Sequence, residues 1–152
     1  MKGQTSHEAK DNRHTDKRTR ARELAMQALY QLDVQGSDLL PYLNEFFVEN
    51  EPDIAVRKLA SDWTKATWEN LEQCDQLIVT STIKWELSRL SPVDRSILRI
   101  SVYQLKFCPD VPPRVVINEA IELPKKFGAE KSSAFVNGVL DAVLKRISAA
   151  QE

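Results

Sequence analysis

Apolar residues recur at three- and four-residue intervals along most of the chain, which is the pattern of amphipathic helices. One clear stripe consists of Ala21, Leu24, Ala25, Ala28, Leu29 and Leu32. A second one consists of Phe135, Val136, Val139, Leu140, Val143, Leu144 and Ile147. No stretch alternates apolar and polar residues for long enough to make a strand. The pattern predicts an all-α fold of about seven helices, three of them before residue 74.

Turn and cap residues indicate where these helices begin and end. Residues 1–17 are polar and lack the helical stripe, so we expect a mobile tail and a first helix that begins near Arg18. Gly36 is a suitable end for that helix. Asp38 is then expected to cap the next helix, with Pro41 in its first turn, where a missing N–H does no harm.

The sequence Ser91-Pro92-Val93-Asp94 predicts another helix start, with Ser91 as the N-cap, Pro92 in the first position and Asp94 reaching back as in a capping box. The helix that follows is apolar on most sides, which predicts a central, buried element; its apolar residues are Val93, Ile97, Leu98, Ile100, Val102 and Leu105. Pro124 lies inside a later helical pattern and is expected to kink or shorten that helix.

The charge of the chain is unevenly distributed. Residues 1–22 hold seven basic and three acidic residues, a net charge of +4, although the whole chain carries −1. Residues 23–152 therefore carry −5. A basic segment on an acidic body is the distribution expected of a protein that offers one local site to a polyanion.

Several classes of protein find no support in the composition. No apolar run approaches the ~20 residues of a membrane span, and the polar N-terminus does not resemble a secretory signal, so we expect a cytoplasmic protein with no membrane partner. Cys74 and Cys108 are expected to be reduced structural thiols. Both histidines lie in the polar tail, which excludes a His/Cys metal site in the body. Glycine-rich phosphate loops and nucleophile motifs are absent, so we expect no cofactor, and no residue pattern calls for enzymatic chemistry, although the absence of such a pattern does not exclude it.

Arg18, Arg20 and Arg22 cluster at the expected start of the first helix. Cations are disfavoured there by roughly 0.3–1 kcal/mol each, because the positive end of the helix dipole repels them. The alternative is a merely solvated helix start. Clustered arginines in an unfavourable place favour binding of an external polyanion, since the guanidinium fork suits phosphates and base edges.

Two other features favour structural roles. Arg95 and Arg99 lie one turn apart on the central helix, and ion pairing with the acidic body is the favoured interpretation, with partner binding as the alternative. Asn137 and Gly138 are poor helix formers inside the last helix. We expect Gly138 to admit a close helix neighbour and Asn137 to bind backbone in the core.

Taken together, ordered motifs over residues 18–147 resemble the NusB family of transcription antitermination and ribosomal-RNA biogenesis factors. The matching segments are RTRARELAMQALY at 18–30, VDRSILRISVY at 93–103, VINEAIEL at 116–123, KFG at 126–128 and FVNGVLD at 135–141. Thr19 stands where many members have another arginine, and Gln104 replaces a commonly acidic residue.

The resemblance implies two packed helical subdomains in one domain over residues 18–148, divided into about 18–73 and 74–148. It implies a non-enzymatic factor that pairs with NusE, a small-subunit ribosomal protein, to bind boxA-type single-stranded RNA. The pair would join the RNA polymerase antitermination complex and support rRNA transcription. By position, the expected RNA contacts are Arg18, Arg20, Arg22, Lys131 in the loop before the last helix, and Phe135. Tyr30 and Asp94 would meet the protein partner or support the RNA site.

Two other functions compete with this interpretation. The fold could serve as the RNA-recruiting module of an rRNA methyltransferase, although residues 1–152 contain no glycine-rich cofactor loop. It could also be a DNA-binding helical regulator, but no basic recognition helix follows a short glycine-containing turn.

Overall fold

The computed structural model describes the backbone of residues 6–82, 87, 90–127 and 131–151, and the side chains within those ranges from residue 17 onward. These residues contain no strand, which confirms the all-α prediction. The helices are α1 (Ser6–Gln35), the 3-10 helix η1 (Ser37–Tyr42), α2 (Leu43–Asn50), α3 (Ile54–Glu69), α4 (Leu71–Ser81), α5 (Pro92–Phe107), α6 (Pro113–Lys126) and α7 (Ser132–Ala150).

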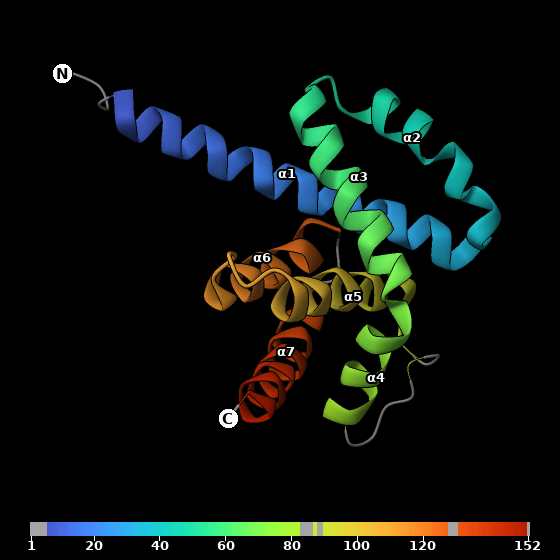
Figure 1. The fold of residues 1–152 in the computed structure, drawn as a ribbon, viewed down its shortest axis with the longest axis vertical. Helices are drawn as coiled ribbons and strands as arrows, with labels where there is room; N and C mark the ends of the chain where they lie inside the picture. The colour runs from blue at the N-terminus through green and yellow to red at the C-terminus, as the bar shows by residue number, and fades with distance from the viewer. Residues whose placement is uncertain (1–5, 83–86, 88–89, 128–130, 152) are drawn as a thin grey trace.

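Helix α5 is the centre of the fold and packs against α1, α3, α4, α6 and α7 (Figure 1). It begins as the sequence predicts: Pro92 is in its first turn, and the Ser91 hydroxyl accepts a hydrogen bond of 3.1 Å from the Asp94 amide. The Asp94 carboxylate does not have the expected capping-box partner, however, because its Oδ2 accepts a 3.0 Å hydrogen bond from Ser132 on α7. Asp94 therefore ties the starts of α5 and α7 together.

Helix α1 presents the predicted apolar stripe to the core, and all six of its residues are buried. It packs against η1, α2 and α3, which form one group of helices, while α4 to α7 form the second. The groups meet where α1 and α3 lie against α5, so the architecture of two packed helical subdomains is confirmed.

The structure differs from the sequence prediction at the first two helix starts. Helix α1 begins at Ser6 rather than near Arg18, because helix formation at an exposed end does not require an apolar stripe. It ends before Gly36, which has a left-handed φ of 92°. Residues 37–42 then form η1, so Asp38 is not the cap of an α-helix, and α2 begins only at Leu43. Pro41 lacks the N–H that an α-helical turn would use.

Two expectations about the last helices also change. Pro124 is buried within the last turn of α6, which continues to Lys126, so this proline does not end the helix. Asn137 and Gly138 on α7 are exposed rather than in the core. A Cβ built on Gly138 meets no atom of the described chain within 4 Å, so this glycine does not serve a close helix contact.

Candidate nucleic-acid interface

The three arginines at 18, 20 and 22 point in different directions around α1, as a rotation of about 100° per residue dictates. Arg18 is half-buried and forms no hydrogen bond or ion pair with any side chain that the structure describes. Its guanidinium is therefore available to an external anion. Of the three arginines, Arg18 fits the sequence prediction most directly.

Arg20 is held by acceptors of the protein itself. Its Nε donates to Glu51 Oε2 at 2.9 Å, its Nη1 to Glu23 Oε1 at 2.8 Å and its Nη2 to the Asn50 carbonyl at 2.8 Å. One helical turn earlier, the Lys17 ammonium lies 3.2 Å from Asp53 Oδ2. The side chain of Arg20 is still 34% exposed, so the guanidinium remains within reach of solvent.

Arg22 lies inside the protein, with only 4% of its surface exposed. Its Nε donates to Gln104 Oε1 at 3.0 Å, its Nη1 lies 3.4 Å from Glu119, and the guanidinium stacks 5.2 Å from the centre of the Trp63 ring. Burial lowers the pKa of Arg22, and Glu119 opposes that shift. Direct contact with RNA would require Arg22 to leave all of these partners.

Glu119 on α6 also receives a 2.5 Å hydrogen bond from the Thr19 hydroxyl. Thr19, which stands where the family often has an arginine, therefore links α1 to α6. Glu23, four residues after Thr19 on α1, is buried. It pairs with Arg20 and also with Lys126 at the end of α6, whose Nζ lies 2.6 Å from Glu23 Oε2. Sequence reasoning missed Lys126, because only the fold brings it to the arginine-rich start of α1.

Helix α7 packs against α6. Lys131 is exposed, and Phe135 is partly buried against the core. Ser133 donates to the Ile121 carbonyl at 3.0 Å, which fixes the first turn of α7 on α6. We use the name basic face for residues 17–20 of α1 together with Lys126, Lys131 and Phe135; within this set, the ion pair between Lys126 and Glu23 joins the end of α6 to α1. Gly128 and Glu130 lie outside the described residues.

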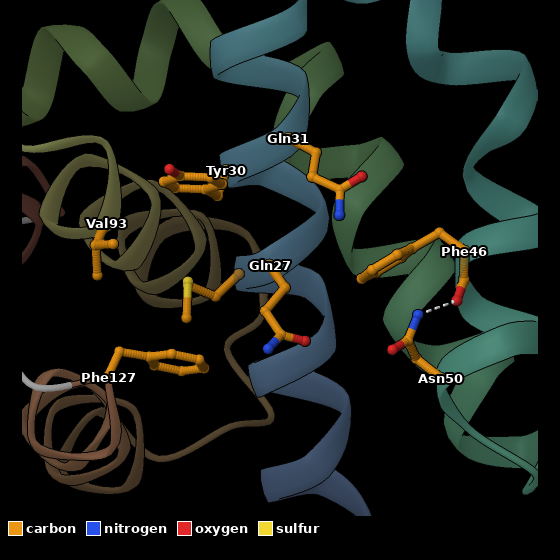
Figure 2. A pocket seen from close by; sticks show the side chains of 8 residues that line it. Gln27, Tyr30, Gln31, Phe46, Asn50, Val93 and Phe127 are labelled. Carbon is orange, nitrogen blue, oxygen red and sulfur yellow. Dashed lines mark hydrogen bonds between the residues drawn. The ribbon is translucent and has the colours of Figure 1, made fainter.

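A groove of about 300 Å³ lies beside the basic face and contains Tyr30 (Figure 2). Figure 2 shows Val93 and Phe127 on one side of α1, and Phe46 and Asn50 on the other. Tyr30 is 38% exposed and Phe127 is 37% exposed. The remaining lining residues are Met26, Gln27 and Gln31. Mixed aromatic, aliphatic and amide groups at the surface are typical of a protein-binding site.

A partly buried ion network joins α1, α4 and α5 and confirms the favoured interpretation of Arg95 and Arg99. Asp33 on α1 pairs with Arg95 at 2.5 Å and with Arg99 at 2.9 Å, and Arg99 also pairs with Asp75 on α4 at 2.8 Å. The two arginines hold the pKa of Asp33 below its usual value, although burial opposes them. These cations are occupied by the protein and are not part of the basic face.

The described residues include no group of His, Cys, Asp or Glu side chains that could hold a metal ion. No described helix is long and apolar enough to cross a membrane. Cys74 and Cys108 are free thiols, as expected, and burial raises the pKa of Cys74 to about 12.

Comparison with known proteins agrees with the resemblance seen in the sequence. The model of the NusB family matches residues 19–145. A transcription antitermination protein NusB from Anaeromyxobacter dehalogenans is 46% identical over 130 residues, which cover 85% of this chain and 91% of the relative. The protein of the same name from Clostridium perfringens is 45% identical over 134 residues, covering 86% and 98%.

Solved structures give the same result. NusB from T. maritima superposes with a TM-score of 0.76 at 40% identity, covering 84% of this chain and 90% of that one. A chain from a crystal structure of the antitermination factors NusB and NusE in complex with double-stranded RNA has a TM-score of 0.75 at 29% identity, covering 86% and 98%.

Proposed function

Because the chain belongs to the NusB family, we propose that it is a non-enzymatic RNA-binding adaptor of transcription antitermination. It pairs with the ribosomal protein NusE, binds boxA-type single-stranded RNA and joins the antitermination complex on RNA polymerase in the cytoplasm, thereby supporting rRNA transcription. The observation that carries this proposal is the likeness, over 86% of the chain, to a structure that contains NusB, NusE and RNA.

The basic face supplies the RNA contacts in this proposal. Arg18 and Lys131 bind phosphates with free cationic groups, and Arg20 does so when its own carboxylates release it. Phe135 at the start of α7 contributes an aromatic side chain beside a base. Arg22 acts from the interior, where it holds the start of α1 against Trp63 and α6. Three to four phosphate contacts predict a slope of about −2 to −3 in log affinity against log salt.

The groove around Tyr30 supplies the contact with NusE. An exposed aromatic ring in a partly apolar hollow can bury area against a partner, and the acidic body favours a basic ribosomal protein. Asp94 supports both surfaces, because its hydrogen bond to Ser132 fixes the start of α7 beside the start of α5. The groove and the basic face adjoin, because Asn50 lines the groove and its carbonyl accepts a hydrogen bond from Arg20.

A fluorescence titration with a boxA-like oligonucleotide and a scrambled control, with and without NusE, tests this function. We expect a preference for boxA that increases when NusE is present. Arg18→Ala and Lys131→Ala should weaken RNA binding, whereas Lys145→Ala should not. Lys145 is a suitable control because it is an exposed lysine of α7, about 21 Å along that helix from Lys131. Absence of both the boxA preference and the NusE effect would contradict the proposal.

The partner site needs its own variant. Tyr30→Ala should weaken binding of NusE and leave RNA binding by the isolated protein unchanged. Tyr42→Ala is the matched control, because Tyr42 is 58% exposed but is not one of the groove residues. If both tyrosine variants bind NusE like the unaltered protein, the groove is not the partner site.

A further inference from the structure

The junction between α2 and α3 places two carboxylates against the start of α1. Glu51 Oε2 lies 2.9 Å from Arg20 Nε, and Asp53 Oδ2 lies 3.2 Å from Lys17 Nζ. We call Glu51 and Asp53 the acidic corner. Its two ion pairs join cations of the basic face to a different part of the chain.

The acidic corner holds these cations as a phosphate group would. Carboxylate and phosphate oxygens are alternative acceptors for a guanidinium. Glu51 binds Arg20 through Oε2 alone, while its Oε1 accepts a 3.3 Å hydrogen bond from the Asp53 amide. Glu51, together with Glu23 and the Asn50 carbonyl, provides an acceptor to every nitrogen of the Arg20 guanidinium. An RNA phosphate that approaches Arg20 must therefore share or replace one of these acceptors.

The negative charge of Asp53 is separable from its structural role. Asp53 is the N-cap of α3 and accepts hydrogen bonds from the amides of Ala55 at 2.9 Å and Val56 at 3.4 Å. Asparagine caps a helix about as well as aspartate, so capping does not require the charge. The hydrogen bond from Lys17 is the main reason that the pKa of Asp53 lies below its usual value. The carboxylate is thus engaged with the cation as well as with the helix.

We propose that the acidic corner is an autoinhibitory contact, in which Glu51 and Asp53 compete with RNA phosphates for Arg20 and Lys17. This proposal rests on the proposed function of the basic face. It predicts that free protein keeps these cations occupied, and that only a polyanion able to supply several phosphates at once displaces the corner. The corner then weakens non-specific binding more than it weakens binding of an RNA that is also held at Lys131 and Phe135.

The test removes the charges and keeps the shapes, by combining Glu51→Gln and Asp53→Asn. The matched control is Glu45→Gln with Glu49→Gln: it removes the same charge from the neighbouring exposed face of α2, where neither glutamate has an ion pair within the described chain. Affinity is measured for the boxA-like oligonucleotide, for the scrambled one and for inorganic polyphosphate. Circular dichroism verifies that each variant is folded.

We expect the corner variant to bind all three probes about three- to tenfold more tightly than the unaltered protein, a range consistent with releasing two partly exposed ion pairs. The gain should be larger for the scrambled oligonucleotide and polyphosphate than for the boxA-like oligonucleotide. The control should show a smaller gain. The gain from Glu51→Gln should disappear when Arg20 is replaced by alanine, and the gain from Asp53→Asn should disappear when Lys17 is replaced.

Three results would overturn the proposal: unchanged or weaker binding by the corner variant, an equal gain in the control, or a gain that persists without the cations. Weaker binding would mean that the carboxylates position Arg20 and Lys17 for RNA. The proposed function fails in a different way, through loss of the boxA preference in the unaltered protein. The polyphosphate measurement still decides between competition and positioning in that case.

Discussion

Replacing Gln104 with glutamate should stabilise this protein, because Arg22 and Gln104 are imperfectly matched. Arg22 Nε donates to Gln104 Oε1 at 3.0 Å. Two further donors, Arg22 Nη2 and Gln104 Nε2, are buried and have no hydrogen-bond partner among the described residues. An arginine binds best to two parallel oxygen acceptors, whereas glutamine offers one oxygen and one N–H donor group. A glutamate at this position would replace the unsatisfied amide with an acceptor.

The size of the effect follows from two opposing contributions. A hydrogen bond to a charged group is worth about 1.5–3 kcal/mol, and burying the new carboxylate opposes it. Because Arg22 is already buried beside Glu119 and Trp63, only the carboxylate must still be desolvated. We expect a net gain of about 1–2 kcal/mol, which raises Tm by roughly 2–8 °C at this chain length.

Thermal and urea unfolding followed by circular dichroism measure this change. The decisive comparison repeats Gln104→Glu in an Arg22→Met background, where the same substitution should destabilise the protein by about 3 kcal/mol, because the buried carboxylate has lost its cation. A sign reversal between the two backgrounds supports the reasoning. If Gln104→Glu destabilises the protein in both, Arg22 is not an under-satisfied cation and the argument is refuted.

Three further predictions concern the interior and α7. The folded pKa of Asp33 is lowered, so the stability it provides is complete above its unfolded pKa near 4 and is lost as the pH falls through the folded value; Asp33→Asn should flatten the decline of Tm below pH 5, and an equally steep decline would refute this. Cys74 is buried with its pKa raised to about 12, so mass spectrometry should find it unmodified by iodoacetamide at pH 8 until the protein unfolds; rapid labelling of the native state would contradict this. Gly138→Ala should increase the free energy of unfolding by about 0.5–1 kcal/mol, because the added methyl meets no described atom within 4 Å; destabilisation in urea would show a constraint at this position.

Local patterns predicted the fold well. The stripe of α1 and the start of α5 at Ser91-Pro92 depend on residues that are close in sequence, and the structure confirms both. The all-α architecture follows from such patterns. The early start of α1 at Ser6 was missed for the same reason, because periodicity detects only the part of a helix that faces a core.

The candidate site was harder to predict, because its properties depend on residues far apart in the chain. Arg18, Arg20 and Arg22 look alike in sequence. In the structure, Arg20 is bound by Glu51, and the buried Arg22 donates a hydrogen bond to Gln104. Neither partner is near the arginines in sequence. Lys126 joins the basic face only because Glu23 reaches the end of α6. Charge patterning located the polyanion site on α1 but could not assign a separate role to each arginine.

Crosslinking of a boxA-like RNA that contains 4-thiouridine, followed by mass spectrometry of the peptides, tests the central claim most directly. The account predicts crosslinks at the start of α1, around Arg18, and at the start of α7, around Lys131 and Phe135, with the α1 crosslinks lost in Arg18→Ala. Crosslinks concentrated near the C-terminal end of α7, around Lys145, about 21 Å along that helix from Lys131, would show that RNA binds elsewhere and would contradict the basic face as the RNA site.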